Sequence, residues 1–258
     1  MINEIELLKS QGFNLASTTD AISALAINKH FSFSKNIISE SKMEYCMLDN
    51  ILYQPDLFVD LLKKYPVFNF DPEYWSSASH IPGFRQRIAN RDLLPLIKLW
   101  SNAYFAIKNK SFPFIFDWHC ATNIYVKDMK INLIPHVDGD SFVSNMWLMK
   151  NMSNCGTGFY KLKMNGKEYY RFSTMTPNEK TQYLEIDSEL RKKPYPWRPW
   201  EPNEYWELYA TIPSIYNSSL LYEGDFFHQG IFDEKNWPEN IIRYSLVSFL
   251  WNTNFQSN

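Results

Sequence analysis

The spacing of apolar residues divides the chain into a helical first part and a strand-rich remainder. Apolar residues recur at helical intervals over residues 14–30, 55–64 and 90–108. A proline opens the second of these segments, and an asparagine can cap the third. The buried side of the third segment is expected to consist of Leu93, Leu94, Ile97, Leu99 and Trp100. Residues 1–110 are therefore predicted to form a mostly helical N-terminal layer.

From about residue 112 the pattern changes to short aromatic and β-branched runs separated by polar turns, which is typical of strands. The candidate strands are 112–118, 122–127, 132–138, 142–150, 157–164, 166–172, 218–223 and 242–251. Several such strands with no helices between them predict an antiparallel barrel or a double-sheet jelly roll. We therefore expect one domain over residues 1–258, mainly β with α, whose core at 111–258 packs against the N-terminal helices.

One stretch, residues 194–206, fits neither period. It has four prolines within nine residues and several tryptophans, so we expect an irregular path. Long irregular loops in compact domains are often functional, and this one could cover an active site. A surface arm or a dimer contact is an equal alternative.

Composition and charge narrow the class of protein. Of the 258 residues, 45% are hydrophobic and 17% aromatic, which is typical of a globular chain and not of a disordered one. The formal net charge is -2, so no overall field attracts nucleic acid or an anionic membrane. No apolar run reaches the roughly 18 residues that span a bilayer, and the first residues lack the pattern of a secretory signal.

The three cysteines, Cys46, Cys120 and Cys155, are odd in number and widely spaced, with no CxxC motif. We interpret them as free thiols in a reducing compartment, and we expect a cytoplasmic protein.

The strongest chemical signal is His136-Val137-Asp138, followed much later by His228. In an extended strand, side chains two residues apart point to the same side, so His136 and Asp138 can face one metal ion. Two imidazoles and one carboxylate are the facial triad of non-haem Fe(II) oxygenases, which leaves coordination positions open. An HxD triplet alone also arises by chance. In that alternative, His136 is a surface histidine with a structural role.

A basic residue follows this set, at the start of the last predicted strand. Arg243 and Ser245 are two residues apart and can present a guanidinium and a hydroxyl to the same side. A guanidinium can hold the far carboxylate of 2-oxoglutarate with two parallel hydrogen bonds. In the alternative, Arg243 lies at an exposed strand edge and pairs with Asp233 or Glu239.

Together, His136-Val-Asp138, His228 and Arg243-x-Ser245 resemble the motifs of the Fe(II)/2-oxoglutarate-dependent oxygenase superfamily, prolyl 4-hydroxylase-like branch. Three more stretches resemble a bacterial and phage family of that superfamily with no settled substrate. They are Met47–Asp56, Ile81–Arg85 and Gly156–Tyr160.

The resemblance implies a cupin-like double-stranded β-helix with iron at His136, Asp138 and His228. It implies that Arg243 and Ser245 bind 2-oxoglutarate, and that Tyr125 lies near the position of a tyrosine that bonds this cosubstrate in related enzymes. Because Asp138 is a carboxylate, the resemblance favours hydroxylation over halogenation.

We therefore expect an Fe(II)- and 2-oxoglutarate-dependent dioxygenase that uses O₂ to hydroxylate a C–H bond and releases succinate. Its substrate would be an amino acid, a peptide or a small molecule, and a nucleic acid is disfavoured. Two other classes stay open: a non-catalytic binding module on the same barrel, and a zinc enzyme with a His-Asp-His site. Oligomeric state and substrate identity do not follow from the sequence.

Overall fold

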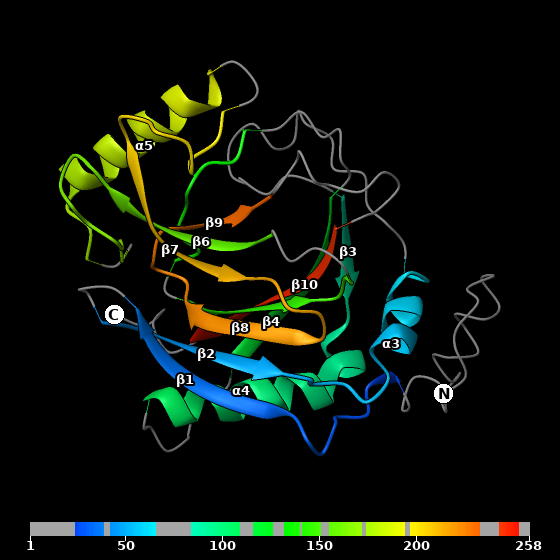
Figure 1. The fold of residues 1–258 in the computed structure, drawn as a ribbon. Helices are drawn as coiled ribbons and strands as arrows, with labels where there is room; N and C mark the ends of the chain where they lie inside the picture. Colours follow the sequence, from blue (N-terminus) through cyan, green and yellow to red (C-terminus); the bar gives the residue numbers. More distant parts are fainter. Residues whose placement is uncertain are drawn as a thin grey trace, which may run out of the picture.

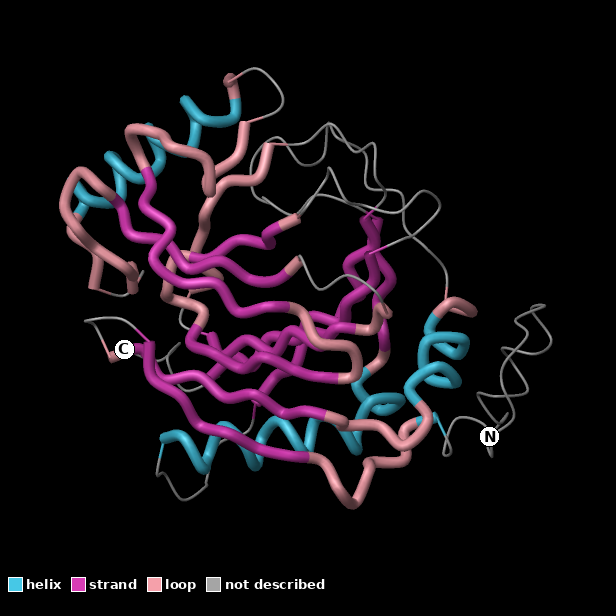
Figure 2. The backbone as a smooth tube through the Cα atoms, in the orientation of Figure 1, coloured by secondary structure: helices cyan, strands magenta, loops and turns pink. Residues whose placement is uncertain are grey.

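Antiparallel strands fill the centre of the molecule, and helices lie at its periphery (Figures 1 and 2). The structure is a computed structural model. It describes residues 24–38, 42–65, 84–108, 116–125, 132–139, 141–150, 155–171, 174–193, 197–232 and 243–252.

The structure describes few helices. They are α3 (Pro55–Leu62), the 3-10 turn η2 (Asn90–Leu93), α4 (Leu94–Lys108) and α5 (Pro177–Arg191). Among the described residues, no helix is long and apolar enough to cross a bilayer.

The strands form two antiparallel sheets. Their bounds are β1 (Ser32–Ile38), β2 (Met43–Asp49), β3 (Phe84–Ile88), β4 (Phe116–Tyr125), β5 (Ser141–Trp147), β6 (Gly156–Leu162), β7 (Trp206–Pro213), β8 (Ser218–Glu223), β9 (His228–Ile231) and β10 (Arg243–Asn252). The large sheet has the order β1-β2-β8-β5-β10-β4-β3, and the small sheet has the order β7-β6-β9.

Alternation along the strands separates two apolar cores. In β10, Leu246 and Leu250 belong to the core that includes residues of α3 and α4, whereas Val247 belongs to the core between the two sheets. Figure 1 shows α4 running along the large sheet, away from β6, β7 and β9. Trp100 of α4 is fully buried in the first core, and its indole Nε1 donates to Ser219 Oγ of β8 at 3.1 Å.

A third apolar cluster joins the small sheet to α5. Tyr183 and Leu190 on one side of α5 are buried with Tyr160 of β6 and Phe227. Most residues on the other sides of α5 are polar, although Leu184 is exposed there, and the helix packs on the small sheet through Tyr183 and Leu190.

Several predicted elements are present. The segment 218–223 coincides with β8, and β5, β6 and β10 lie within a few residues of the strands expected there. The second predicted helix is α3, and it has a proline in its first turn. The strands expected at 112–118 and 122–127 are one strand, β4, in the described residues.

The N-terminal part differs from the mostly helical layer that the sequence predicted. Strands β1, β2 and β3 fall within 1–110 and extend the large sheet. Of the first predicted helix, residues 14–23 lie outside the described residues, and 24–30 contain turns and a single bridge between Ile27 and Leu52. Short runs such as β2 do not reveal their period, and pairing with β8 decides their conformation.

Details of the third helix also differ. The helical path begins at Asn90 itself, with Ala89 in the N-cap position, so Asn90 is not the cap. Leu93, Ile97 and Trp100 are buried as expected, whereas Leu94 is exposed.

In the second half, two predicted strands are not continuous. Residues 132–138 and 166–171 form isolated bridges only, and residue 172 lies outside the described residues. Helix α5, which no pattern had predicted, lies between β6 and β7. Residues 197–205 are irregular as expected, and 194–196 lie outside the described residues.

Candidate metal centre

The backbones of His136 and His228 lie side by side. His136 N donates to His228 O at 3.1 Å, and His228 N donates to His136 O at 3.0 Å. This reciprocal pair is a single antiparallel bridge between segment 132–139 and the first residue of β9. Side chains of such directly opposed residues lie on the same face, and the two imidazole centroids are 4.6 Å apart.

Asp138 completes the cluster from two residues beyond His136. Its Oδ2 lies 3.0 Å from His228 Nε2, and its Oδ1 lies 3.6 Å from His136 Nε2. One potential ligand atom from each of the three residues lies within 4.8 Å of the others. The structure therefore brings together the three side chains that the sequence analysis singled out as metal ligands.

Backbone carbonyls set the orientation of both imidazoles. His136 Nδ1 lies 3.2 Å from Ile134 O, and His228 Nδ1 lies 2.9 Å from Phe226 O. A carbonyl only accepts, so these contacts are hydrogen bonds in the tautomer that has its proton on Nδ1, and the two Nε2 atoms face Asp138. Metal-binding histidines typically have such a partner on the other ring nitrogen.

The cluster is buried and is flanked by neutral phenols. His136 and His228 are 8% and 6% exposed. The Tyr222 ring packs edge-on against the His228 imidazole at 4.9 Å. Burial raises the pKa of Tyr222 well above its usual value, and the nearby Asp138 carboxylate raises that pKa further. Tyr222 is therefore protonated at neutral pH and adds no negative charge.

A second tyrosine has the same relation to the acidic ligand. Burial raises the pKa of Tyr183 on α5, and the carboxylates of Asp187 and Asp138 raise it further.

Arg243 lies inside the molecule, against the strand that contains His228. It is 3% exposed, and its guanidinium stacks over the Phe232 ring at 4.5 Å. A Cβ built on Gly230 would lie 3.6 Å from Arg243 Nη1. Gly230 follows His228 by two residues in β9, so the guanidinium reaches the face of β9 on which the His228 side chain lies.

The alternative of an exposed Arg243 at a strand edge is wrong, because the residue is buried. Its suggested partners, Asp233 and Glu239, lie outside the described residues.

The structure describes the side chain of Ser245 but only the backbone of Tyr125. Ser245 is 1% exposed, and its Oγ has no hydrogen-bond partner within the described residues. The register of β4 and β10 pairs Tyr125 with Arg243. The side chain of Tyr125 lies outside what the structure describes.

Two residues of β5, one polar and one apolar, lie in the space between the sheets. Asn145 Nδ2 donates to Thr157 Oγ1 of β6 at 3.4 Å, so it spans the two sheets. Trp147 is paired in register with Ser245 and belongs to the apolar core between the sheets. Trp147 therefore has a packing role.

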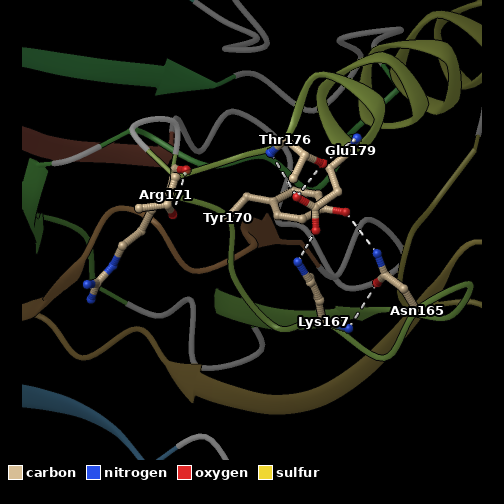
Figure 3. Close-up of polar contacts among 7 residues, drawn as sticks. Asn165, Lys167, Tyr170, Arg171, Thr176 and Glu179 are labelled. Carbon is tan, nitrogen blue, oxygen red and sulfur yellow. Dashed lines mark hydrogen bonds and ion pairs between the residues drawn. The ribbon is translucent and has the colours of Figure 1, made fainter.

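Residues 168–170, here called the strip, form backbone hydrogen bonds with residues 225–227, which come just before His228. Phe227 N donates to Glu168 O, and Tyr170 N donates to Asp225 O, both at 2.9 Å. Next to this strip is a small pocket of about 180 Å³ in which Lys167 and Glu179 form an ion pair (Figure 3). Asn165 fixes the turn there, because its side chain bonds both Tyr170 OH and Lys167 N.

The sequence analysis missed two residues that support the cluster, Gly224 and Tyr222. Gly224 O accepts from Asp138 N at 2.6 Å, and Tyr222 packs on His228. Gly224-Asp225 after a strand indicates a turn, and that signal could have drawn attention to the position.

The protein is thus a mainly β protein of antiparallel sheets, and it has a His-Asp-His cluster that could hold a metal ion. The chain belongs to a family of unknown function, DUF6445, whose model matches residues 29–240. No curated protein matches the sequence.

Three solved structures illustrate the proteins whose chains follow a similar path. The non-haem α-ketoglutarate-dependent carbocyclase SnoK from nogalamycin biosynthesis is 9% identical, with a TM-score of 0.46, over 93% of this chain and 85% of that one. Iron-bound HygX from Streptomyces hygroscopicus is 8% identical, with a TM-score of 0.45, over 93% and 87%. AviO1 from Streptomyces viridochromogenes Tue57 is 10% identical, with a TM-score of 0.42, over 93% and 96%.

Proposed function

We propose that this protein is an Fe(II)- and 2-oxoglutarate-dependent oxygenase that hydroxylates a C–H bond of an amino acid, peptide or small molecule. The observation that carries the proposal is the convergence of His136, Asp138 and His228, with ligand atoms within 4.8 Å of one another. The donor set fits iron, since two imidazoles and one carboxylate occupy one face of an octahedral ion and leave the other face open.

The arrangement of the strands supports the core that such enzymes use. In chain order, β4, segment 132–139, β5, β6 with β7, β8, β9 and β10 alternate between the large sheet and the small one. Segment 132–139 joins the small sheet through the bridge between His136 and His228. Alternation of this kind is typical of a jelly roll, and we propose a double-stranded β-helix here.

Arg243 and Ser245 are proposed to bind the distal carboxylate of 2-oxoglutarate. A buried guanidinium retains its charge and can bind a carboxylate through two hydrogen bonds. The Ser245 hydroxyl is buried two residues further along β10 and can donate another. Tyr125, in register with Arg243, is a candidate third donor.

This clamp separates the proposal from a zinc enzyme. Catalytic zinc also takes three protein ligands and a water molecule. Activation of water, however, requires no buried cation on the same face of β9 as His228. Prolyl 4-hydroxylase-like ancestry and a cytoplasmic location stay predictions.

The protein itself would contribute position and the exclusion of water. When bound, iron together with 2-oxoglutarate and O₂ would supply the oxidation. The Nδ1 bonds of His136 and His228 keep both Nε2 atoms available to the metal. The apolar core between the sheets keeps water away from the reacting centre.

The test is metal-dependent turnover of 2-oxoglutarate. Protein purified without oxygen should bind one Fe²⁺, and metal-loaded protein should bind 2-oxoglutarate and release succinate when a substrate is supplied. His136→Ala should lower metal affinity by roughly a hundred-fold or more, since it removes one of three ligands. His30→Ala changes an exposed histidine and is the matched control.

Calorimetry gives the metal and cosubstrate affinities, and chromatography gives the succinate yield. Wild-type protein that binds zinc but not 2-oxoglutarate would exclude the oxygenase in favour of a hydrolytic metal site. Wild-type protein that binds no metal would exclude both.

A further inference from the structure

Asp138 lies where segment 132–139 turns into β5, and local hydrogen bonds hold that turn. Gly139 has φ of 72°, a left-handed conformation that favours glycine. Ser141 N donates to Gly139 O at 2.7 Å, and Ser141 Oγ donates to Asp138 O at 3.1 Å.

A second glycine, distant in the chain, ties this turn to the end of β8. Gly224 O accepts from Asp138 N at 2.6 Å, and Gly224 N donates to Ser141 O at 2.7 Å. One residue thereby bonds both sides of the turn that carries the acidic ligand.

The approach is so close that a side chain does not fit at position 224. A Cβ built there would lie 2.5 Å from Ser141 Oγ, 3.1 Å from Asp138 Cβ and 3.2 Å from Ser141 O. The Ser141 hydroxyl can rotate away. Asp138 Cβ and the Ser141 carbonyl are fixed to the backbone and would have to shift by a few tenths of an ångström.

The residues beside Gly224 limit its own freedom to move. Glu223 forms an ion pair with Lys108 of α4, and Asp225 Oδ2 lies 2.6 Å from Arg171 Nε. With both neighbours anchored, a substitution at 224 would displace the turn instead of the end of β8.

We propose that Gly224 is a positioning residue for Asp138: its lack of a side chain sets where the carboxylate stands relative to His136 and His228. The inference rests on the proposed metal site. Bond lengths to a metal tolerate changes of only about 0.2 Å, so a shift of Asp138 weakens binding even when the fold is kept.

The experiment compares Gly224→Ala with the wild type in the full chain, with Co²⁺ as the probe. We expect Co²⁺ affinity to fall about 10- to 100-fold, as for other residues that orient ligands, and the visible spectrum of bound Co²⁺ to change. Gly166→Ala is the matched control. Unlike Gly224, Gly166 has a positive φ, 69°, and no atom would lie within 4 Å of a Cβ added there. That variant should lose stability and keep both the affinity and the spectrum.

The outcomes separate this inference from the proposed function. If the wild type binds Co²⁺ and Gly224→Ala binds it with the same affinity and spectrum, the inference fails while the metal site stands. If the wild type binds no metal, both fail. Should Gly224→Ala not fold, the double variant Gly224→Ala/Ser141→Ala removes the contact with Ser141 Oγ and keeps those with Asp138 Cβ and Ser141 O. An unchanged Co²⁺ affinity and spectrum in that variant would also overturn the inference.

Discussion

After the three residues of the metal cluster, Arg243 is the residue whose surroundings say most about the proposed function. It is 3% exposed and stacks on Phe232. Arginine is the side chain that keeps its charge when buried, and its planar group both stacks and forms paired bonds. A lysine at this position would offer a point charge without that geometry.

Arg243→Lys should therefore weaken 2-oxoglutarate binding by roughly 10- to 100-fold, the value of hydrogen bonds to a charged group. Metal affinity should not change. Calorimetry on the Ni²⁺-loaded protein would measure both constants. The comparison ligand is 2-oxopentanoate, which has the chelating end but no distal carboxylate. Equal losses for the two ligands would contradict a role for Arg243 at the far carboxylate.

At this scale, the sequence predicts chemistry better than it predicts support. His136, Asp138, His228 and Arg243 are of residue types that are common in metal and anion sites, and the two-residue spacing of His136 and Asp138 predicts that they face the same side. Gly224 has no such signal, because its role depends on how closely two distant backbone segments approach.

Among the elements, α5 has a start that the local sequence specifies completely. Thr176 Oγ1 accepts from Glu179 N at 3.3 Å, while Glu179 Oε2 accepts from Thr176 N at 2.9 Å, with Pro177 in the first turn. This capping box is visible in Figure 3, where Lys167 also reaches Glu179. The motif was readable as a helix start, although the weak apolar pattern of α5 hid the helix itself.

Thr176→Ala should lower the free energy of unfolding by about 1 kcal/mol, the usual value of an N-cap. Thermal denaturation followed by circular dichroism measures the change. Thr181→Ala, on the exposed side of the same helix, is the control and should cost less. If both variants melt alike, the capping bonds contribute no stability.

Strand prediction failed where pairing, and not composition, decides the structure. Segments 132–139 and 166–171 have strand-like residues but meet their neighbours at single bridges. β1 and β2, in contrast, lie in a part where helices were expected and are held by a full register of pairs. Pairing partners far away in the chain are not encoded in local periodicity.

For the whole molecule, one buried carboxylate makes stability depend on pH. Burial raises the pKa of Asp187 on α5 from 3.8 to about 6, even though Arg191 Nε lies 2.8 Å from its Oδ2. The folded state therefore binds a proton that the unfolded state releases between pH 4 and 6. Stability from this group is present below that window and is lost as pH rises through it.

Asp187→Asn should remove that loss, so that between pH 4 and 7 the variant gains stability relative to the wild type by on the order of 1–2 kcal/mol. Urea denaturation at a series of pH values measures the difference. Glu185→Gln, exposed on the same helix, should follow the wild-type profile. A parallel pH profile for wild type and Asp187→Asn would refute the role of this carboxylate.

The single bridge between His136 and His228 has a consequence for how the molecule is assembled. Among the described residues, segment 132–139 is joined to β9 by the two backbone bonds between His136 and His228 and by a bond from Gln229 Nε2 to Ile134 O at 3.2 Å. A cation held by side chains from both segments would cross-link them, much as a disulfide closes a loop. Binding of the cation and the docking of segment 132–139 onto β9 would then occur together. A chelator would loosen this contact before it affected the large sheet.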